Sequence, residues 1–148
     1  MASPKVGDLV EIKIAKGFAY ALFTHQHPQF GALLRVLVGQ HKKRPPELVP
    51  LIAEPVQFST FFPLNAAVAR ELVTIVANVG VPEKLSAFPI FRDGVEDPKS
   101  GKVETWWLWD GKKEWCVGPL TSDQSKMPIR QIVNDTMLQT MIEQGRTD

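Results

Sequence analysis

Residues 9–24 read LVEIKIAKGFAYALFT, and this stretch decides the fold class of the chain. Apolar and charged residues alternate through its first six positions, which is the period of a strand with one face in a core. Glu11 and Lys13 are expected on the solvent face. Gly17 closes a short turn because it accepts a positive φ, so residues 18–24 are predicted to return as a second strand. The predicted core-facing positions of the first strand are Val10, Ile12 and Ile14.

Further strands are expected after this hairpin. A polar loop at 25–28 precedes a third predicted strand at 32–38, with Arg35 on its solvent face. Three prolines between residues 45 and 50 exclude a helix from the next segment. Residues 51–62 are expected to hold one or two short strands, with core candidates Phe58, Phe61 and Phe62.

Two helices are predicted. Residues 64–71 favour a short helix with Asn65 as its N-cap, whereas the β-branched residues of 72–79 favour a strand. The segment 82–98 is expected to be irregular, with a turn at Arg92-Asp93-Gly94. A C-terminal helix is expected to start at Asn134 or Asp135 and to end near Gly145. Its apolar stripe is Met137, Leu138, Met141 and Ile142.

The clearest local signal is a tryptophan-rich hairpin over residues 103–120, with its turn at Asp110-Gly111. A two-residue turn would pair Trp106 with Trp115, and a four-residue loop would pair Leu108 with Trp115. Both registers leave the same residues on each face, because they differ by two positions. One face, assigned to the core, holds Trp106, Leu108, Trp115 and Val117; the other holds Trp107, Trp109, Glu114 and Cys116.

Together these elements predict a single α+β domain over residues 1–148. We expect a strongly bent antiparallel sheet or partly open β-barrel, with a short middle helix and a C-terminal helix packed on the sheet. A lone cysteine, Cys116, cannot form an internal disulfide and fits a reducing compartment. We see no signal peptide and no apolar run long enough to span a membrane, so a cytoplasmic protein is expected.

The charge balance bears on possible nucleic-acid partners. The 17 basic and 16 acidic residues leave a net charge of +1. Nucleic-acid binders usually carry a basic excess or stripe, because neutralising phosphates supplies most of their affinity. The one basic cluster, His41-Lys42-Lys43-Arg44, is short and closed by two prolines, which is typical of a solvated turn. Nucleic acid is therefore not favoured as a partner.

The sequence contains few features that would predict a metal site or a catalytic site. His25 and His27 lie two apart, but the paired CxxC or HExxH spacing of zinc sites is missing, so no metal or cofactor is expected. The chain also lacks the motifs of nucleophile elbows, P-loops and dinucleotide-binding turns. Cys116 reads as a small apolar filler on a strand. The acidic residues Asp93, Glu96, Asp97 and Glu104 are common turn formers, so we do not expect an enzyme.

The second face of the tryptophan hairpin is the best candidate for a binding site. Two tryptophans beside a glutamate and a thiol are either covered by another segment or exposed as an aromatic patch. Exposed aromatic residues are enriched at binding sites. The candidate partner-binding residues are Trp107, Trp109, Glu114 and Arg92.

Three groups of motifs, in this order and spacing, point to a known family. The first pairs Gly7-Asp8-Leu9-Val10 with Gly17-Phe18-Ala19-Tyr20, the second is Phe88-Pro89-Ile90-Phe91-Arg92, and the third joins Met127-Pro128-Ile129 to Val133-Asn134-Asp135 and Leu138. Together they resemble the immunity-protein family numbered twenty-six, found in bacterial polymorphic-toxin systems. The matched positions are of the types that form turns, cap helices and pack in cores. The resemblance therefore implies a shared fold more directly than it implies a shared binding site.

The resemblance implies an antitoxin function: a cytoplasmic protein that binds the toxin domain encoded beside it and neutralises that toxin. It implies neither catalysis nor a cofactor. Immunity proteins against nucleases are often acidic, and the near-neutral charge of this chain does not favour a nuclease as its target. Two alternatives stay open, a small-barrel adaptor that binds peptide or nucleic acid through Lys42, Lys43 and Arg44, and a small hydrolase-type enzyme with a deep pocket.

Overall fold

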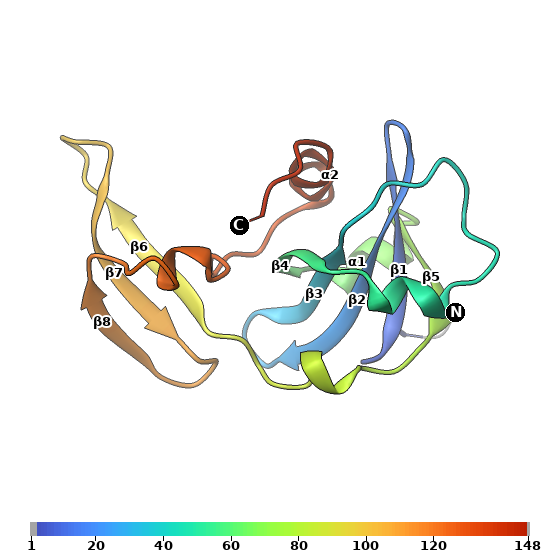
Figure 1. Ribbon diagram of the computed structural model, residues 1–148, viewed down its shortest axis with the longest axis horizontal. Coiled ribbons are helices and arrows are strands. Elements are labelled where there is room, and N and C mark those ends of the chain that lie inside the picture. The colour runs from blue at the N-terminus through green and yellow to red at the C-terminus, as the bar shows by residue number, and fades with distance from the viewer. Residues whose placement is uncertain (1–2, 148) are drawn as a thin grey trace.

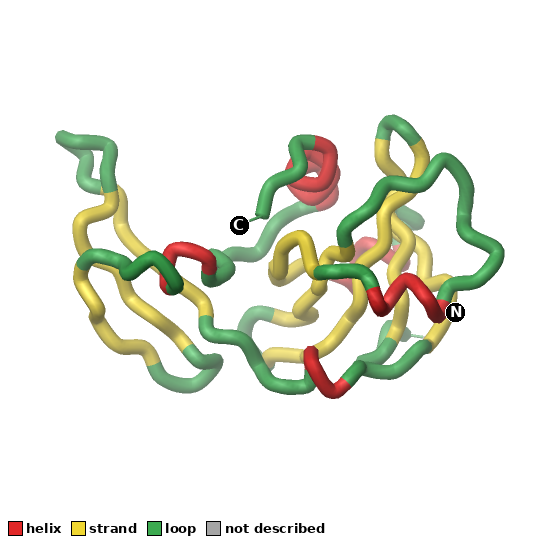
Figure 2. Tube along the Cα trace, viewed as in Figure 1, coloured by secondary structure: helices red, strands yellow, loops and turns green. Residues whose placement is uncertain are grey.

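A computed structural model describes residues 3–147 and shows an α+β fold, in which these residues form eight strands in two antiparallel sheets (Figure 1). Neither sheet closes into a barrel, so the strongly sheet-rich α+β prediction is confirmed and its barrel form is not observed. Figure 2 shows how small the helical share is. The elements are β1 (Asp8–Ile14), β2 (Gly17–His27), β3 (Gly31–Leu37), η1 (Val49–Ala53), β4 (Val56–Phe62), α1 (Leu64–Ala69), β5 (Val73–Asn78), η2 (Glu83–Leu85), β6 (Phe91–Glu96), β7 (Val103–Trp109), β8 (Glu114–Gly118), η3 (Gln124–Lys126) and α2 (Asp135–Glu143).

The larger sheet has the strand order β4-β3-β2-β1-β5 and begins with the predicted hairpin. Ile14 pairs with Gly17 across a two-residue turn, and Gly17 adopts φ 137°. A Cβ atom on Gly17 would lie 2.0 Å from the carbonyl oxygen of His41, whose backbone pairs with Phe18. Two features therefore require glycine at this position: the positive φ of the turn and the close approach of the loop after β3.

Both faces of the larger sheet are buried. Helices α1 and α2 cover the face that carries Val10, Ile12 and Ile14. The segment between β3 and β4 packs on the opposite face, where Leu51 joins Leu9 and Tyr20 in a second cluster. The expectation of a half-buried first strand is wrong for Glu11, because this long segment covers it.

Arg35 is also buried, which corrects its predicted position in solvent. Its Nη2 donates to the carbonyl oxygen of Ala87 at 3.3 Å, while its Nε has no partner. Burial lowers the pKa of the Arg35 guanidinium to about 10, because a low-dielectric environment disfavours the charged form. The residue nevertheless stays charged at neutral pH.

Two predicted loops are strands. Residues 25–27 continue β2 past a bulge, and residues 91–96 form β6 instead of an Arg92-Asp93-Gly94 turn. Gly94 pairs with Trp106, and a Cβ atom there would lie 2.4 Å from Val103 Cγ1. This glycine therefore serves close side-chain packing between strands, a use that sequence alone does not distinguish from a turn.

The helices agree with the predictions except at the N-cap of α1 and at one residue of the apolar stripe of α2. Helix α1 starts after Pro63 with no side-chain cap, so Asn65 is not its N-cap. Asn134 caps α2 by accepting a hydrogen bond from the Met137 N–H at 2.8 Å. Gly145 follows α2 with φ 66°, as expected at a helix C-terminus. Met137 is exposed, whereas the other three stripe residues are buried.

No helix within the described part of the chain is both long enough and apolar enough to cross a membrane.

The smaller sheet, in the order β6-β7-β8, extends away from the larger one (Figure 1). Residues 127–133, which we call the strap, join the two sheets through their edges. Along the edge of β6, the Arg92 N–H donates to the Pro128 carbonyl oxygen at 2.8 Å. Along the edge of β4, the Val133 N–H donates to the Phe61 carbonyl oxygen at 3.0 Å. The strap thereby occupies one edge of each sheet and leaves β5 and β8 at the outer edges.

Candidate functional site

The tryptophan hairpin adopts the register of the four-residue loop, in which Leu108 pairs with Trp115. Trp107 pairs with Cys116 and Trp109 with Glu114, so these four share one face as predicted. Residues on the same face of the hairpin nevertheless differ in how deeply they are buried. Trp107 is 40% exposed and Trp109 only 6%, although they share a face.

The face assigned to the core is also incompletely covered. Leu108 is buried, but Trp115 is 38% exposed and Trp106 is half-buried. Cys116, expected as a buried filler, is exposed. The reason is that α2 packs on the larger sheet, where Leu138, Met141 and Ile142 join its core. The outer part of the smaller sheet is left with two exposed tryptophans, Trp107 and Trp115, on opposite faces.

Trp109 belongs to an aromatic cluster that joins the two sheets, so it is buried and not part of an exposed patch. Its ring lies 4.9 Å from that of Phe30 and 5.5 Å from that of Phe91, measured between centroids. Phe61 of β4 stacks on Phe91 of β6 at 5.1 Å. Burial of large rings between the sheets fixes the base of the hairpin. We call this set the aromatic junction; its members are Phe30, Leu33, Phe61, Phe88, Phe91 and Trp109.

His27 ties the same junction to the turn of the tryptophan hairpin. Its Nδ1 accepts hydrogen bonds from the backbone N–H groups of Gln29 at 3.1 Å and Phe30 at 3.2 Å. Because Nδ1 is an acceptor, the proton lies on Nε2, which donates to the Gly111 carbonyl oxygen at 2.8 Å. Both ring nitrogens are therefore engaged in the fold.

Glu114 lies on the second face of the hairpin beside Arg130, a residue that sequence reasoning missed. Arg130 Nη2 lies 3.1 Å from Glu114 Oε2, and Arg130 Nε donates to Asp93 Oδ2 at 3.2 Å. Its guanidinium also lies over the rings of Trp109 and Phe30. Burial acts to lower the pKa of Arg130, but hydrogen bonds and charges from Asp93 and Glu114 outweigh it and raise the pKa.

This arrangement occupies Glu114 with an internal ion pair. The residues around Arg130 line a hollow of about 520 Å³ next to Trp109, and Lys112 lies at its side. Two carboxylates already neutralise the guanidinium, so the geometry favours a fixed hairpin base over a free charged site. A lone arginine in the strap carries no sequence signal for this role, because its partners lie 16 and 37 positions away in the chain.

Arg92 is buried as well and lies in β6, not in the expected turn. Its Nε donates to the Met127 carbonyl oxygen at 2.8 Å, and its guanidinium lies over the Trp106 ring at 5.3 Å. The side chain therefore holds the strap against β6. The physical reason for the error is that residues 91–96 form a strand whose edge another segment covers.

The exposed end of the smaller sheet has an acidic rim. Trp107 borders a shallow hollow of about 330 Å³, and Val95 beside it is 84% exposed. No basic side chain lines this hollow within the described chain. Its remaining residues are Glu96, Asp97, Pro98, Glu104 and Thr105.

One residue of the basic cluster at 41–44, Arg44, forms an ion pair within the fold. Arg44 Nε donates to Glu11 Oε2 at 2.7 Å, and Tyr20 Oη donates to the same oxygen at 2.8 Å. The hydrogen bond from Arg44 lowers the pKa of the Glu11 carboxyl, although burial opposes the shift. Only Lys42 and Lys43 then extend from this cluster, which gives no stripe for a phosphate backbone.

The histidines do not form a metal centre. His25 Nε2 lies 2.9 Å from the Ser86 carbonyl oxygen, and both nitrogens of His27 are bonded as described above. Within residues 3–147, no group of three or more potential ligand side chains is placed to hold a metal ion.

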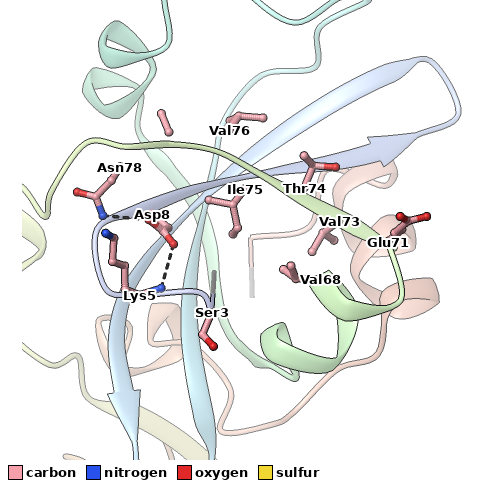
Figure 3. Close-up of a pocket in the computed structure, with 11 residues that line it drawn as sticks. Ser3, Lys5, Asp8, Val68, Glu71, Val73, Thr74, Ile75, Val76 and Asn78 are labelled. Carbon is pink, nitrogen blue, oxygen red and sulfur yellow. Dashed lines mark hydrogen bonds between the residues drawn. The ribbon is translucent and has the colours of Figure 1, made fainter. Parts of the chain in front are cut away.

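A further cavity lies along β5, far from the tryptophans in sequence (Figure 3). It measures about 640 Å³. Val68, Val73 and Ile75 form an apolar wall, Lys5 and Asp8 lie at one end, and Glu71 lies at the other. Asp8 is buried and accepts hydrogen bonds from the backbone N–H of Lys5 and the side chain of Asn78. The cavity is thus mainly apolar, with charges at its ends.

Comparison of the chain with known protein families, with curated proteins and with solved structures gives no match.

Proposed function

We propose that this protein is an antitoxin of the immunity-protein kind, which neutralises a bacterial toxin domain by direct protein–protein association in the cytoplasm. The observation that carries a binding function is the outer end of the smaller sheet, where Trp107 and Trp115 are exposed on opposite faces. Exposed tryptophans supply much of the affinity at protein interfaces, because they bury a large area at a low cost in side-chain entropy.

The hairpin is also preorganised for binding. The aromatic junction and the ion pairs of Arg130 hold its base, so partner binding would not have to order the strands. A rigid presentation of aromatic side chains raises affinity by avoiding that entropy cost.

The surroundings of Trp107 favour a basic partner surface. Glu96 and Glu104 lie at the rim of the hollow that Trp107 borders. An arginine or lysine there would gain both a charge partner and the face of an aromatic ring. The identification of that partner as a toxin rests on the motif resemblance.

The test uses the protein domain encoded beside this chain. The domain is expressed in bacteria with the wild type, with Trp107→Ala or with Trp115→Ala, and growth is recorded. Binding of the purified proteins is measured by calorimetry. We expect the wild type to restore growth, and Trp107→Ala to weaken binding by about 30-fold, as for an interface hot spot.

Val49→Ala provides the matched control, since Val49 is an exposed apolar residue at η1 on the other sheet. It should bind and protect like the wild type. If the wild type neither binds the adjacent domain nor restores growth, the antitoxin function is wrong. If binding is normal in both tryptophan variants, the function stands and the proposed surface is wrong.

A further inference from the structure

We propose that β5 pairs antiparallel with β5 of a second copy of this chain, so that the two larger sheets join across a two-fold axis. This inference goes beyond the antitoxin function and does not depend on it. The strand order places β5 at one end of the larger sheet, next to β1 alone. At the opposite end, the strap already pairs with Phe61 of β4. The β5 edge is therefore the open edge of this sheet among the described residues.

The composition of β5 suits strand pairing. Residues 72–79 read LVTIVANV, without charge or proline. Natural proteins usually protect an open edge with charged residues, prolines or bulges. In β5 only a bulge at Val76 is present, where the pairing to β1 shifts by one residue. An otherwise unprotected apolar edge is expected to have a partner strand.

The cavity beside β5 continues the apolar side of this edge. Ile75 packs only partly into the core, and with Val68 and Val73 it lines the cavity wall. An added strand would place alternate side chains into this space, because successive residues of a strand point to opposite faces. The partner would thereby bury apolar surface in addition to satisfying the backbone groups of β5.

The charges identify the partner as a second copy. The exposed Lys5 lies at the Asn78 end of β5 and the exposed Glu71 at the Val73 end (Figure 3). Asp8 also lies at the Asn78 end, but it is buried and its carboxylate already accepts two hydrogen bonds within the chain. Antiparallel pairing of two identical strands brings opposite ends together, so Glu71 of one copy meets Lys5 of its mate, twice in each dimer. A parallel or unrelated strand has no such reason to match both ends.

This arrangement leaves the tryptophan hairpin free. Trp107 and Trp115 belong to the smaller sheet, which the strap attaches at the β4 side of the larger sheet. The dimer and a complex with a different protein can therefore coexist.

Sedimentation velocity of the full chain over about 1–100 µM tests the proposal. We expect a concentration-dependent dimer. Glu71→Lys and Lys5→Glu should each weaken dimerisation by about tenfold, since every reversal counts twice in a two-fold interface. The double variant with both reversals should regain the wild-type dimer.

Thr74→Lys gives an independent variant at the strand itself. Thr74 is exposed as the second residue of β5, and a lysine there adds the kind of charge with which natural proteins protect an open strand edge from pairing. Thr136→Lys on the exposed side of α2 is its control and should leave the dimer unchanged. Circular dichroism checks that each variant is folded.

If the wild type stays monomeric over this concentration range, the proposal is wrong, and the β5 edge either pairs with a strand of another protein or is solvent-exposed. A dimer that resists Thr74→Lys and both charge reversals equally overturns the placement at β5. If each single charge reversal weakens the dimer but the double variant does not restore it, the proposed pairing of Lys5 with Glu71 across the two-fold axis is wrong.

Discussion

At the scale of the residue, the charged side chains inside the larger sheet differ in how well they are satisfied. Glu11 is buried but accepts hydrogen bonds from Tyr20 and Arg44. Arg35 has one hydrogen bond of 3.3 Å and an unpaired Nε. Paired buried charges are costly to disrupt, because removal of one partner leaves the other without compensation. The Glu11 pair is therefore the one expected to matter for stability.

Arg44→Ala should lower the free energy of unfolding at neutral pH, because it leaves the buried Glu11 carboxylate without its charged hydrogen-bond donor. Its control Lys43→Ala removes an exposed neighbour and should change it by less than about 0.5 kcal/mol. Urea denaturation monitored by circular dichroism measures both. Equal effects of the two variants would show that Arg44 is not a specific partner of Glu11.

The same pair predicts the direction of a pH dependence. The folded-state pKa of Glu11 lies below its ordinary value of 4.5, so the unfolded chain binds the proton more tightly. The stability from this group is complete above about pH 4.5 and is lost as the pH falls through the lowered folded-state pKa. The difference between wild type and Arg44→Ala should therefore shrink toward low pH, and a constant difference would contradict this origin.

At the scale of the element, β6 is a strand because a glycine lets two neighbouring side chains approach it. Val103 Cγ1 and the Trp106 ring occupy the space where a Cβ atom of Gly94 would lie. Val103 is β-branched and has little rotamer freedom with which to move away. The pairing of β6 with β7 thus depends on the absence of a side chain at one position.

Gly94→Ala should destabilise the protein by about 2 kcal/mol through overpacking. Thermal unfolding followed by tryptophan fluorescence measures the loss. Adding Val103→Ala should recover part of it, since the closest contact is then removed. Gly118→Ala in the same sheet meets no atom within 4 Å and tests backbone strain alone, at about 1 kcal/mol. A double variant that recovers nothing would show that Val103 is not the source of the loss.

At the scale of the whole molecule, the aromatic junction and the strap determine whether two sheets behave as one unit. Phe61 takes part in both, through its ring in the junction and its backbone beside the strap. Cooperative unfolding requires that neither sheet be stable without the other. All four tryptophans lie in β7 and β8, so their fluorescence reports on the smaller sheet.

Trp109→Ala should cost about 3–5 kcal/mol, because it leaves a cavity in the junction. It should also separate the fluorescence transition from the transition followed by far-ultraviolet circular dichroism, whereas in the wild type we expect the two to coincide. Trp107→Ala, on the same strand but exposed, should cost less than about 1 kcal/mol and keep the transitions together. Coincident transitions in Trp109→Ala would show that the strap alone couples the sheets.

Local patterns determined much of the fold. Alternation predicts β1, the glycine turn predicts β2, and the Asp-Gly pair predicts the β7–β8 hairpin with the correct faces. Asn134 and Gly145 mark the limits of α2. These signals are strong because each depends on residues within a few positions of one another, where backbone geometry and hydrogen bonding are local.

Tertiary structure alone decided which faces are covered. The segment after β3 covers Glu11, the segment that holds Ala87 contacts the buried Arg35, the junction buries Trp109, and the strap packs against Arg92. Their covering partners lie tens of residues away, so no local pattern distinguishes Trp107, which stays exposed, from Trp109 on the same face. The sequence by itself thus determined the strands and the hairpin faces of this protein, while long-range packing decided which of those residues a partner can reach.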